Sequence, residues 1–394
     1  MTSNQGEAKP SKFTGFLVVV VVFLSTIGGM PQANAEVVDE EMAEVIAEFE
    51  GITVDEAKRA SAIGERVPQL ERRLAAEAPN SFGGAYFDYA PVPLITVRWK
   101  AGQSVPAWLL DEPNVHVEFS EHNLAELLQQ QAQAIETMEQ GGVTVDAWAD
   151  VRSGEVRVQA ILEEADVARR LTDDLPAVEV EKTDQLAQGA AAVEAGQVGE
   201  PVCTSGFVVK HATFGKRATT AAHCVDSQPM RRLGPATVSL SGAWKGGSRD
   251  FAHFKVTSGH ALSPTIFKGW ATNQNGQRYE VRSTVAGTTG RSGTYVGKYV
   301  CKYGKVTGQT CGKISSESQS AGYLGTSTSQ TFVRVERGVG APALSAQGDS
   351  GGPWFDGNRA LGWTSGTVTK NGSNVAAIYM SVDFLPPGWT VALS

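Results

Sequence analysis

Apolar residues recur at helical spacing in residues 37–79, which follow an apolar N-terminal run. A break at Gly51 is followed by Thr53 and Glu56, the pattern of a capping box at a helix N-terminus. The spacing therefore predicts two helices, of which the second continues to about Leu74.

Residues 85–99 alternate apolar and polar side chains as strands do, but Pro91 and Pro93 interrupt them. Because proline cannot donate to a strand ladder, we expect edge or bulged structure here. Further strands are predicted at 115–119, 143–151, 155–161 and 178–181, and helices at 121–139 and 163–171. The order βαββαβ predicts one split-βαβ sheet, antiparallel, with both helices on one face.

Composition changes after the last of these strands. Residues 182–200 are rich in Ala, Gly and Gln with few large apolar side chains, which is typical of a linker. From Pro201 onward short strand-like runs alternate with Gly, Ser, Asn and Thr clusters, and no segment has helical periodicity. This second half is therefore predicted to be all-β.

The N-terminus has the pattern of a secretory signal peptide. Lys9 and Lys12 precede an apolar core at residues 16–24, and Ala33-Asn34-Ala35 gives a small-x-small cleavage site. The apolar core is shorter than the ~20 residues that a membrane-spanning helix needs. We expect cleavage near Ala35, export to the extracellular space and no stable membrane anchor.

The net charge of −8 conceals two oppositely charged parts. Residues 36–200 carry a net charge of −21, and residues 201–394 carry +12. Opposite charges of this size favour binding between the two parts. Alternatively, the acidic part is only well solvated and the basic part binds anionic polymers. Basic residues do not alternate with aromatic ones as in nucleic-acid readers, so no nucleic-acid partner is expected.

All four cysteines, Cys203, Cys224, Cys301 and Cys311, lie in the basic part. Export permits disulfides. Three pairings are possible, and we favour Cys203–Cys224 with Cys301–Cys311 because each closes a short strand–turn–strand segment. A zinc site is the competing interpretation, but the C-x2-C and H-x3-H spacings of such sites are missing. No metal or cofactor is expected.

Residues 348–353 (GDSGGP) place Ser350 between glycines, which permit a kinked loop and close approach of a substrate backbone. Serine is a weak nucleophile unless a general base and oxyanion donors accompany it. His223 follows two strand-like runs and is the candidate base, and Asp250 is the candidate carboxylate that orients it. The backbone N–H groups of Gly348 and Ser350 would form the oxyanion hole.

The order His223, Asp250, Ser350 and the local sequences around them resemble the chymotrypsin-like serine peptidases. They are most similar to the secreted bacterial branch, the streptogrisin and α-lytic protease family. Residues 203–207 (CTSGF) and 301–312 also match that family's pattern. The resemblance implies two antiparallel β-barrels with the cleft between them, His223 and Asp250 on the first and Ser350 on the second.

The acidic part occupies the position of that family's pro-region, and the hairpin at 150–158 resembles a segment of it. The resemblance implies that this α+β pro-region assists folding of the protease and inhibits it until it is removed. We therefore expect a signal peptide at 1–35, a pro-region at 36–190 and a protease domain at 191–394, with the maturation cut within 187–199. A permanent accessory domain is the alternative.

Residues 360–367 resemble the strand that pairs with the substrate backbone beside the primary pocket. The resemblance implies that Ser365, Gly366 and Thr367 bind substrate, and that Ser365 lies near Asp250. Lys302 is the family-based candidate for a cationic partner of Asp349.

The chain departs from the family pattern around this pocket. Ala343, Ser345 and Ala346 stand where a third disulfide would have its cysteine, and Thr367 replaces a common glycine. Leu344 occupies the position where an aspartate would favour Lys or Arg. We expect a looser pocket that favours apolar P1 residues.

Three hypotheses follow from the sequence. The first is a monomeric, exported serine endopeptidase made as a zymogen, which cleaves protein or peptide substrates through an acyl-enzyme. The second is a catalytically inactive homologue that acts as a binding module, and the third is a narrow regulatory peptidase. Other histidines, His211, His253 and His260, are expected to be surface or packing residues.

Overall fold

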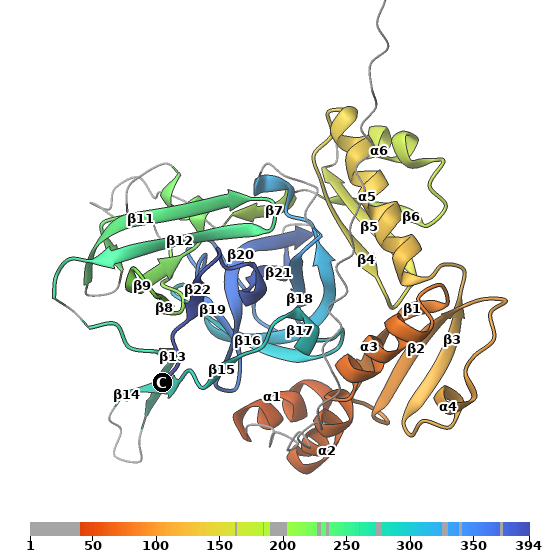
Figure 1. Cartoon of the computed structure of the whole chain (residues 1–394), viewed down its shortest axis with the longest axis horizontal. Helices are drawn as coiled ribbons and strands as arrows, with labels where there is room; N and C mark the ends of the chain where they lie inside the picture. The colour runs from red at the N-terminus through yellow and green to blue at the C-terminus, as the bar shows by residue number, and fades with distance from the viewer. Residues whose placement is uncertain are drawn as a thin grey trace, which may run out of the picture. The chain divides into compact units, whose positions relative to one another are not determined.

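Two β-barrels and an α+β region make up the part of the chain that the computed structural model describes (Figure 1). The described residues are 40–161, 164–183, 185–189, 203–226, 230–233, 236–259, 261–272, 278–324, 330–338, 341–370 and 373–394. They belong to one compact unit, Val38–Ser394. The predicted signal peptide lies outside them.

Three helices open the α+β region: α1 (Glu40–Glu50), α2 (Val54–Gly64) and α3 (Val67–Glu77). The predicted capping box is present, since the side chains of Thr53 and Glu56 each accept the other's backbone N–H at the start of α2. The prediction of one helix continuing to Leu74 is wrong. Pro68 lies in the first turn of α3, where its missing N–H is tolerated, so a new helix begins there.

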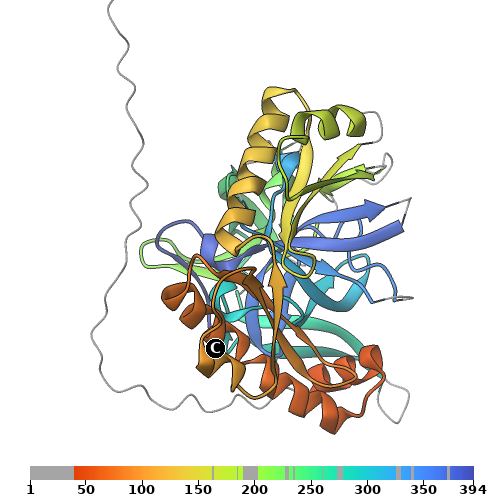
Figure 2. The ribbon, with the colours of Figure 1, turned by 90° about the vertical axis from the view of Figure 1, so that its right-hand side faces the viewer.

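An α-β-β-α-β arrangement then occurs twice (Figures 1 and 2). The first copy comprises α3, β1 (Phe82–Asp88), β2 (Leu94–Lys100), α4 (Ala107–Leu110) and β3 (Val115–Ser120). The second comprises α5 (Leu124–Gln140), β4 (Val145–Asp150), β5 (Glu155–Ile161), α6 (Ala165–Thr172) and β6 (Val178–Thr183). In each copy two strands form an antiparallel hairpin, and a helix leads to a third strand that pairs in parallel.

The prediction of a single antiparallel split-βαβ sheet is therefore wrong, although the order of its helices and strands is right. β3 pairs with β2 in one three-stranded sheet, and β4, β5 and β6 form another. α5 connects the two sheets, with Leu127, Ile135 and Met138 buried in the core of the second. Alternation identifies a strand but not its partner, which explains the error.

The expected linker is in part a strand. β6 continues to Thr183, and β7 (Gln185–Gly189) pairs antiparallel with β20 of the second barrel. Residues 190–200 of that linker lie outside the described residues.

The first barrel is a six-stranded sheet in the order β10–β11–β12–β9–β8–β22. Its strands are β8 (Val209–His211), β9 (Gly215–Thr220), β10 (Arg232–Leu233), β11 (Ala236–Gly246), β12 (Arg249–Val256) and β22 (Trp389–Val391). Between the barrels in sequence lie the hairpin β13 (Thr265–Thr272) and β14 (Arg278–Thr284) and the short β15 (Gly287–Thr288).

The second barrel closes on itself, because β20 pairs with both β19 and β21 along the path β20–β19–β16–β17–β18–β21. Its strands are β16 (Tyr299–Gly304), β17 (Gly308–Gln319), β18 (Phe332–Glu336), β19 (Pro353–Asp356), β20 (Arg359–Lys370) and β21 (Ser373–Ser381). The predicted fold class, two antiparallel barrels preceded by an α+β region, is confirmed.

Close packing joins the two barrels at Trp363. Its indole Nε1 donates to Thr219 Oγ1 at 2.9 Å, and its ring meets Phe207 edge-on at 5.7 Å between centroids. A Cβ on Gly206 would lie 2.3 Å from the Trp363 ring and 2.6 Å from the Gly351 carbonyl oxygen. Any larger residue at position 206 would push the barrels apart.

The α+β region contacts the second barrel along β4, which is an edge strand of its own sheet. Ser320 of the barrel donates its N–H to the Ala147 carbonyl at 2.9 Å, and its Oγ accepts from the Ala147 N–H at 2.8 Å. Gln131 and Ala149 bond to Ser318 at 2.7 and 3.1 Å. The barrel thus covers an edge that would otherwise be open to other strands.

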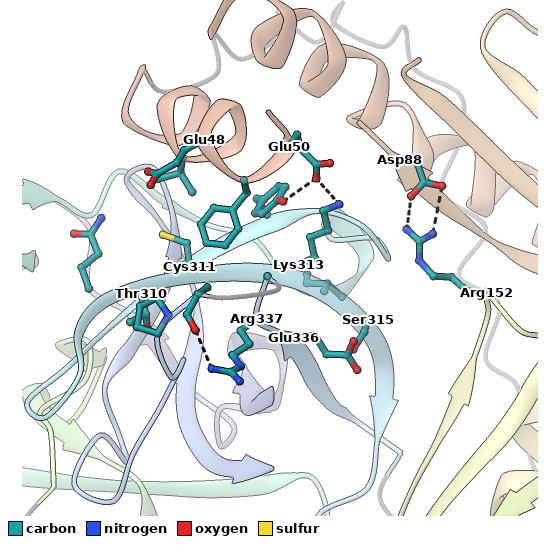
Figure 3. Close-up of a pocket in the computed structure, with 18 residues that line it drawn as sticks. Glu48, Glu50, Asp88, Arg152, Thr310, Cys311, Lys313, Ser315, Glu336 and Arg337 are labelled. Carbon is teal, nitrogen blue, oxygen red and sulfur yellow. Dashed lines mark hydrogen bonds and ion pairs between the residues drawn. The ribbon is translucent and has the colours of Figure 1, made fainter. Parts of the chain in front are cut away.

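Opposite charges meet across the same interface. The ion pairs are Glu41–Lys268, Glu50–Lys313, Glu65–Lys298 and Glu181–Lys370. Figure 3 shows Glu50 beside Lys313 at a cavity of about 1060 Å³. The Tyr299 hydroxyl donates to the same Glu50 carboxylate at 2.7 Å. These charged contacts add to the apolar packing of α1, whose Met42 and Ile46 are buried in the core.

Two like charges also face each other across this interface, Glu71 of α3 and Glu317 of β17. Burial, reinforced by the charge of Glu317, raises the pKa of Glu71 to about 8. Burial likewise raises the pKa of Glu317. A carboxyl whose pKa rises on folding stabilises the folded state at low pH, and this contribution is lost as pH rises through the folded pKa.

The free energy of unfolding should therefore fall as pH rises from 5 to 8, and Glu71→Gln should remove part of this fall. We expect the variant to be more stable than the wild type by about 3 kcal/mol at pH 8 and similar to it at pH 5. The measurement is denaturant unfolding of the full chain carrying Ser350→Ala. Glu77→Gln, at an exposed position of the same helix, is the control. An unchanged pH dependence in Glu71→Gln would contradict the assignment.

Candidate active site

Three side chains that the sequence singles out meet between the barrels. His223 lies in the 3-10 turn η1 (Ala222–Val225), Asp250 on β12, and Ser350 in the loop before β19. The distance from His223 Nε2 to Ser350 Oγ is 2.7 Å, and His223 Nδ1 lies 2.7 Å from Asp250 Oδ2. The other carboxylate oxygen of Asp250 accepts the His223 backbone N–H at 3.0 Å. One imidazole therefore links the hydroxyl to the carboxylate.

The Asp250 carboxylate is fully buried, with an exposed fraction of 0%. Burial alone would raise its pKa, but the contacts with His223 and the hydrogen bond from Ser365 lower it below its ordinary value. Asp250 is thus a buried anion whose orientation is fixed by several donors. Ser365 of β20 lies where the resemblance placed it, against Asp250.

A second buried carboxylate, Asp349, holds the serine loop. Its Oδ2 lies 2.7 Å from Lys302 Nζ, and both side chains have an exposed fraction of 0%. The Val306 N–H donates to Oδ1 at 2.8 Å, and the Ala346 N–H and Thr307 Oγ1 donate to Oδ2 at 3.0 and 2.6 Å. Burial would raise the pKa of Asp349, but Lys302 and these donors lower it. Lys302 is thus the partner that the sequence suggested.

The serine loop is kinked as its glycines allow. Gly348 has φ 107° and Gly351 has φ 82°, a region that side chains rarely adopt. Thr204 ties the loop to the first barrel, since its N–H donates to the Ser350 carbonyl and its Oγ1 to the Gly348 carbonyl, both at 2.8 Å. Ser350 is therefore fixed from both barrels.

The predicted substrate strand is occupied by the chain itself. β7 pairs antiparallel with β20, with Gly189 opposite Gly366 and Gln188 opposite Thr367. An extended segment thus lies along Gly366 and Thr367, the residues that the sequence assigned to substrate binding.

Hydrogen bonds connect the segments that a third disulfide would join in the family. Ser345 Oγ lies 2.7 Å from Thr367 Oγ1, and Asn374 donates to the Ser345 carbonyl. Ser345 is buried, and Leu344 beside it belongs to an apolar core. The Thr367 hydroxyl is thereby directed toward the serine loop.

Tyr323 is a site residue that the sequence did not reveal. Its hydroxyl donates to Ser365 Oγ at 2.8 Å, and its ring lies edge-on to His223 at 6.1 Å between centroids. It belongs to the short turn η3 (Gly322–Leu324), which carries no recognisable motif. Only the folded barrel brings this turn to Asp250.

Two further histidines of the first barrel, His211 and His253, lie apart from these groups. His253 stacks on Trp244 and Trp389, and burial lowers its pKa to about 4. His211 contacts Phe214 and Trp389. Both are packing residues, and His260 lies outside the described residues.

Disulfides join Cys203 to Cys224 and Cys301 to Cys311, the pairing favoured from the sequence. The first holds the segment that contains His223. Within the described ranges, His, Cys, Asp and Glu side chains nowhere form a group of three that could hold a metal. A search of the same ranges for helices long and apolar enough to cross a membrane finds none.

A serine hydroxyl bonded to an imidazole, which is bonded in turn to a buried carboxylate, can attack an acyl carbon while the imidazole takes the proton. Two antiparallel barrels with this arrangement between them are characteristic of the chymotrypsin-like serine peptidases.

Comparison with known proteins finds proteases that are similar to part of this chain. The chain is 26% identical over 167 residues to Serine protease 2 of Streptomyces fradiae, across 42% of this chain and 86% of that protein. Protease A of Thermobifida fusca is 25% identical, with a TM-score of 0.39 over 52% of this chain and 98% of its own. The Cellulomonas bogoriensis chymotrypsin is 26% identical, with a TM-score of 0.36 and the same coverage. No protein-family profile matches the chain.

The resemblance to the bacterial chymotrypsin-like serine peptidases is thus confirmed, and the sequence similarity indicates a peptidase that hydrolyses peptide bonds. The similar region covers less than half of the chain.

Lys302→Met should destabilise the protein by about 3–5 kcal/mol, because it leaves the Asp349 carboxylate buried without a cation. Denaturant unfolding of the Ser350→Ala chain measures the loss. Lys305→Met, at an exposed position three residues on, is the control and should be close to neutral. Adding Asp349→Asn to Lys302→Met should recover part of the lost stability. If Lys302→Met is as stable as Lys305→Met, the ion pair does not have this role.

Proposed function

We propose that this chain is an exported serine endopeptidase made as a zymogen, with His223, Asp250 and Ser350 as its catalytic residues. The observation that carries the proposal is the pair of 2.7 Å hydrogen bonds that His223 makes, one with Ser350 Oγ and one with Asp250. A binding module derived from an enzyme has no need to keep this geometry, so we favour the active enzyme over the inactive homologue.

In the proposed reaction Ser350 Oγ attacks the peptide carbonyl carbon while His223 takes the hydroxyl proton. Asp250 fixes the tautomer of His223 and stabilises the imidazolium. The carbonyl oxygen becomes an oxyanion, which accepts hydrogen bonds from the N–H groups of Gly348 and Ser350. His223 then protonates the leaving amine, and the resulting acyl-enzyme is hydrolysed by water that His223 activates in the same way.

The α+β region is proposed to be a pro-region that inhibits the enzyme. β7 lies on β20 along Gly366 and Thr367, which is the edge that a substrate strand would need. While this pairing persists, a second strand has no access to the same backbone groups of β20. Removal of β7 is therefore a condition for activity on other proteins.

The same region is proposed to assist folding of the second barrel. It contacts β17 through β4 and brings acidic side chains to Lys268, Lys298 and Lys313. The barrel is built from non-local strand pairs, which form slowly because long loops must close first. A docked template that holds one strand in place shortens that search.

The proposed organisation is a signal peptide at 1–35, a pro-region at 36–190 and a monomeric, secreted protease at 191–394. The disulfides are in keeping with an oxidising, extracytoplasmic compartment. The substrates are proteins or peptides, and the pro-region is the internal partner.

Ser350→Ala should abolish maturation as well as hydrolysis. In a host without extracellular proteases, we expect the wild type to be secreted as a product that begins within 188–200, whereas the variant stays joined to the pro-region. Intact mass and N-terminal sequencing of both secreted proteins measure this, and circular dichroism checks that the variant is folded.

Two results would oppose the proposal. Hydrolysis by folded Ser350→Ala would mean that another group is the nucleophile. A wild type that remains full length from Glu36 would mean that the α+β region is a lasting domain or that an external enzyme removes it.

Thr367 is proposed to restrict the primary pocket to small apolar P1 residues, because its hydroxyl is directed across to Ser345 at 2.7 Å. Thr367→Gly removes this side chain and should shift kcat/KM toward large P1 residues such as Phe by about tenfold or more relative to Ala. Peptide substrates that differ only at P1 measure the ratio. Thr367→Ser keeps the hydroxyl and should stay close to the wild type. An unchanged ratio in Thr367→Gly would show that other residues set the P1 preference.

A further inference from the structure

Asp250 is connected to a tyrosine as well as to His223. Tyr323 donates its hydroxyl to Ser365 Oγ at 2.8 Å, and Ser365 donates its own proton to Asp250 Oδ2. His223 Nδ1 lies 2.7 Å from the same Oδ2. One hydrogen-bonded chain thus runs from Tyr323 through Ser365, Asp250 and His223 to Ser350.

The direction of this chain follows from what each group can donate. A serine hydroxyl has a single proton, so a hydrogen bond accepted from Tyr323 leaves that proton for Asp250. Burial, with the negative charge of Asp250 as a second cause, raises the pKa of Tyr323 well above its ordinary value. Tyr323 therefore stays protonated and remains a donor throughout the pH range in which His223 works.

In the uncleaved chain, contacts besides this hydrogen bond also fix the position of Tyr323. Its ring packs edge-on against His223 at 6.1 Å, and the turn η3 that carries it begins at Gly322. The Gly322 N–H donates to Asp146 Oδ1 of the α+β region at 3.2 Å. A Cβ on Gly322 would lie 2.7 Å from the Val145 carbonyl oxygen, so the turn packs closely against β4.

We propose that Tyr323 is a positioning residue for catalysis: through Ser365 it directs the Asp250 carboxylate so that His223 is held in line with Ser350. The inference rests on the proposed function. Without the tyrosine hydroxyl, Ser365 is free to rotate and donate elsewhere, and Asp250 loses a donor that fixes its orientation. The ring contributes packing, and the hydroxyl contributes the alignment.

A double-mutant cycle tests this role, with four secreted enzymes made from the full chain: wild type, Tyr323→Phe, Ser365→Ala and the double variant. Tyr323→Phe keeps the ring and removes only the hydroxyl. We expect kcat on a peptide substrate to fall about fivefold to tenfold, the equivalent of one hydrogen bond, with KM nearly unchanged. The active enzyme in each sample is counted with a fluorophosphonate probe, so that poor maturation is not read as a low kcat.

The decisive result is the effect of Tyr323→Phe in the Ser365→Ala background. If Tyr323 acts through Ser365, the double variant should match Ser365→Ala within about twofold, because the link is already missing. The acid limb of the kcat/KM pH profile should also move to higher pH in Tyr323→Phe, since Asp250 loses donation and holds an imidazolium more strongly. Packing alone would not move this limb.

Multiplicative losses in the double variant, or a Tyr323→Phe enzyme with wild-type kcat and pH profile, would overturn the inference. Failure of the proposed function gives a different result: Ser350→Ala would then hydrolyse the same peptide, or the wild type would not hydrolyse it. If Tyr323→Phe fails to mature by itself, an added protease removes the pro-region from both the wild type and the variant. The same kcat and pH criteria are then applied to the two processed enzymes.

Discussion

The structure depends on keeping one carboxylate charged where water cannot reach it. Asp250 is fully buried between two barrels, and an unpaired carboxylate there would cost several kcal/mol. The fold supplies donors from separate parts of the chain: the backbone and ring of His223 and the hydroxyl of Ser365. Since these donors come from η1 and β20, Asp250 has its full set of donors only when both barrels are assembled. The donors that keep Asp250 ionised are also the contacts that align His223 with Ser350.

The proposed folding role of the α+β region concerns the second barrel. Every contact described above reaches that barrel or the hairpin before it: β4 on β17, β7 on β20, and the glutamates on Lys268, Lys298 and Lys313. Both barrels contain strand pairs that are distant in sequence: β8 pairs with β22 in the first, and β16 with β19 and β18 with β21 in the second. In the proposed folding role the acidic region supports the second barrel, partly through charges that salt would screen.

How far the sequence predicts this structure depends on how local each feature is. The capping box at Thr53, the strand and helix order of the acidic region and the disulfide pairs follow from short patterns. The residues near Ser350 were found because motifs mark them. The pairing of β3 with β2 was not predicted, because alternation shows which side chains share a face of a strand but not which strand lies beside it. Tyr323 was missed for the same reason: its contact with Ser365 exists only after distant segments meet.

The missing third disulfide illustrates how a non-covalent contact changes a site. In the family that disulfide joins the serine loop to the segment after the substrate strand, and here Ser345 and Thr367 join them by one hydrogen bond of 2.7 Å. Asn374 adds a second bond to the Ser345 carbonyl. Hydrogen bonds can break and re-form where a disulfide cannot, so Thr367 can turn aside for a substrate side chain at a net cost of about 1 kcal/mol. With β7 paired on β20, the bond to Ser345 is intact. The looser pocket stays a prediction, and the buried Lys302–Asp349 pair holds the serine loop itself.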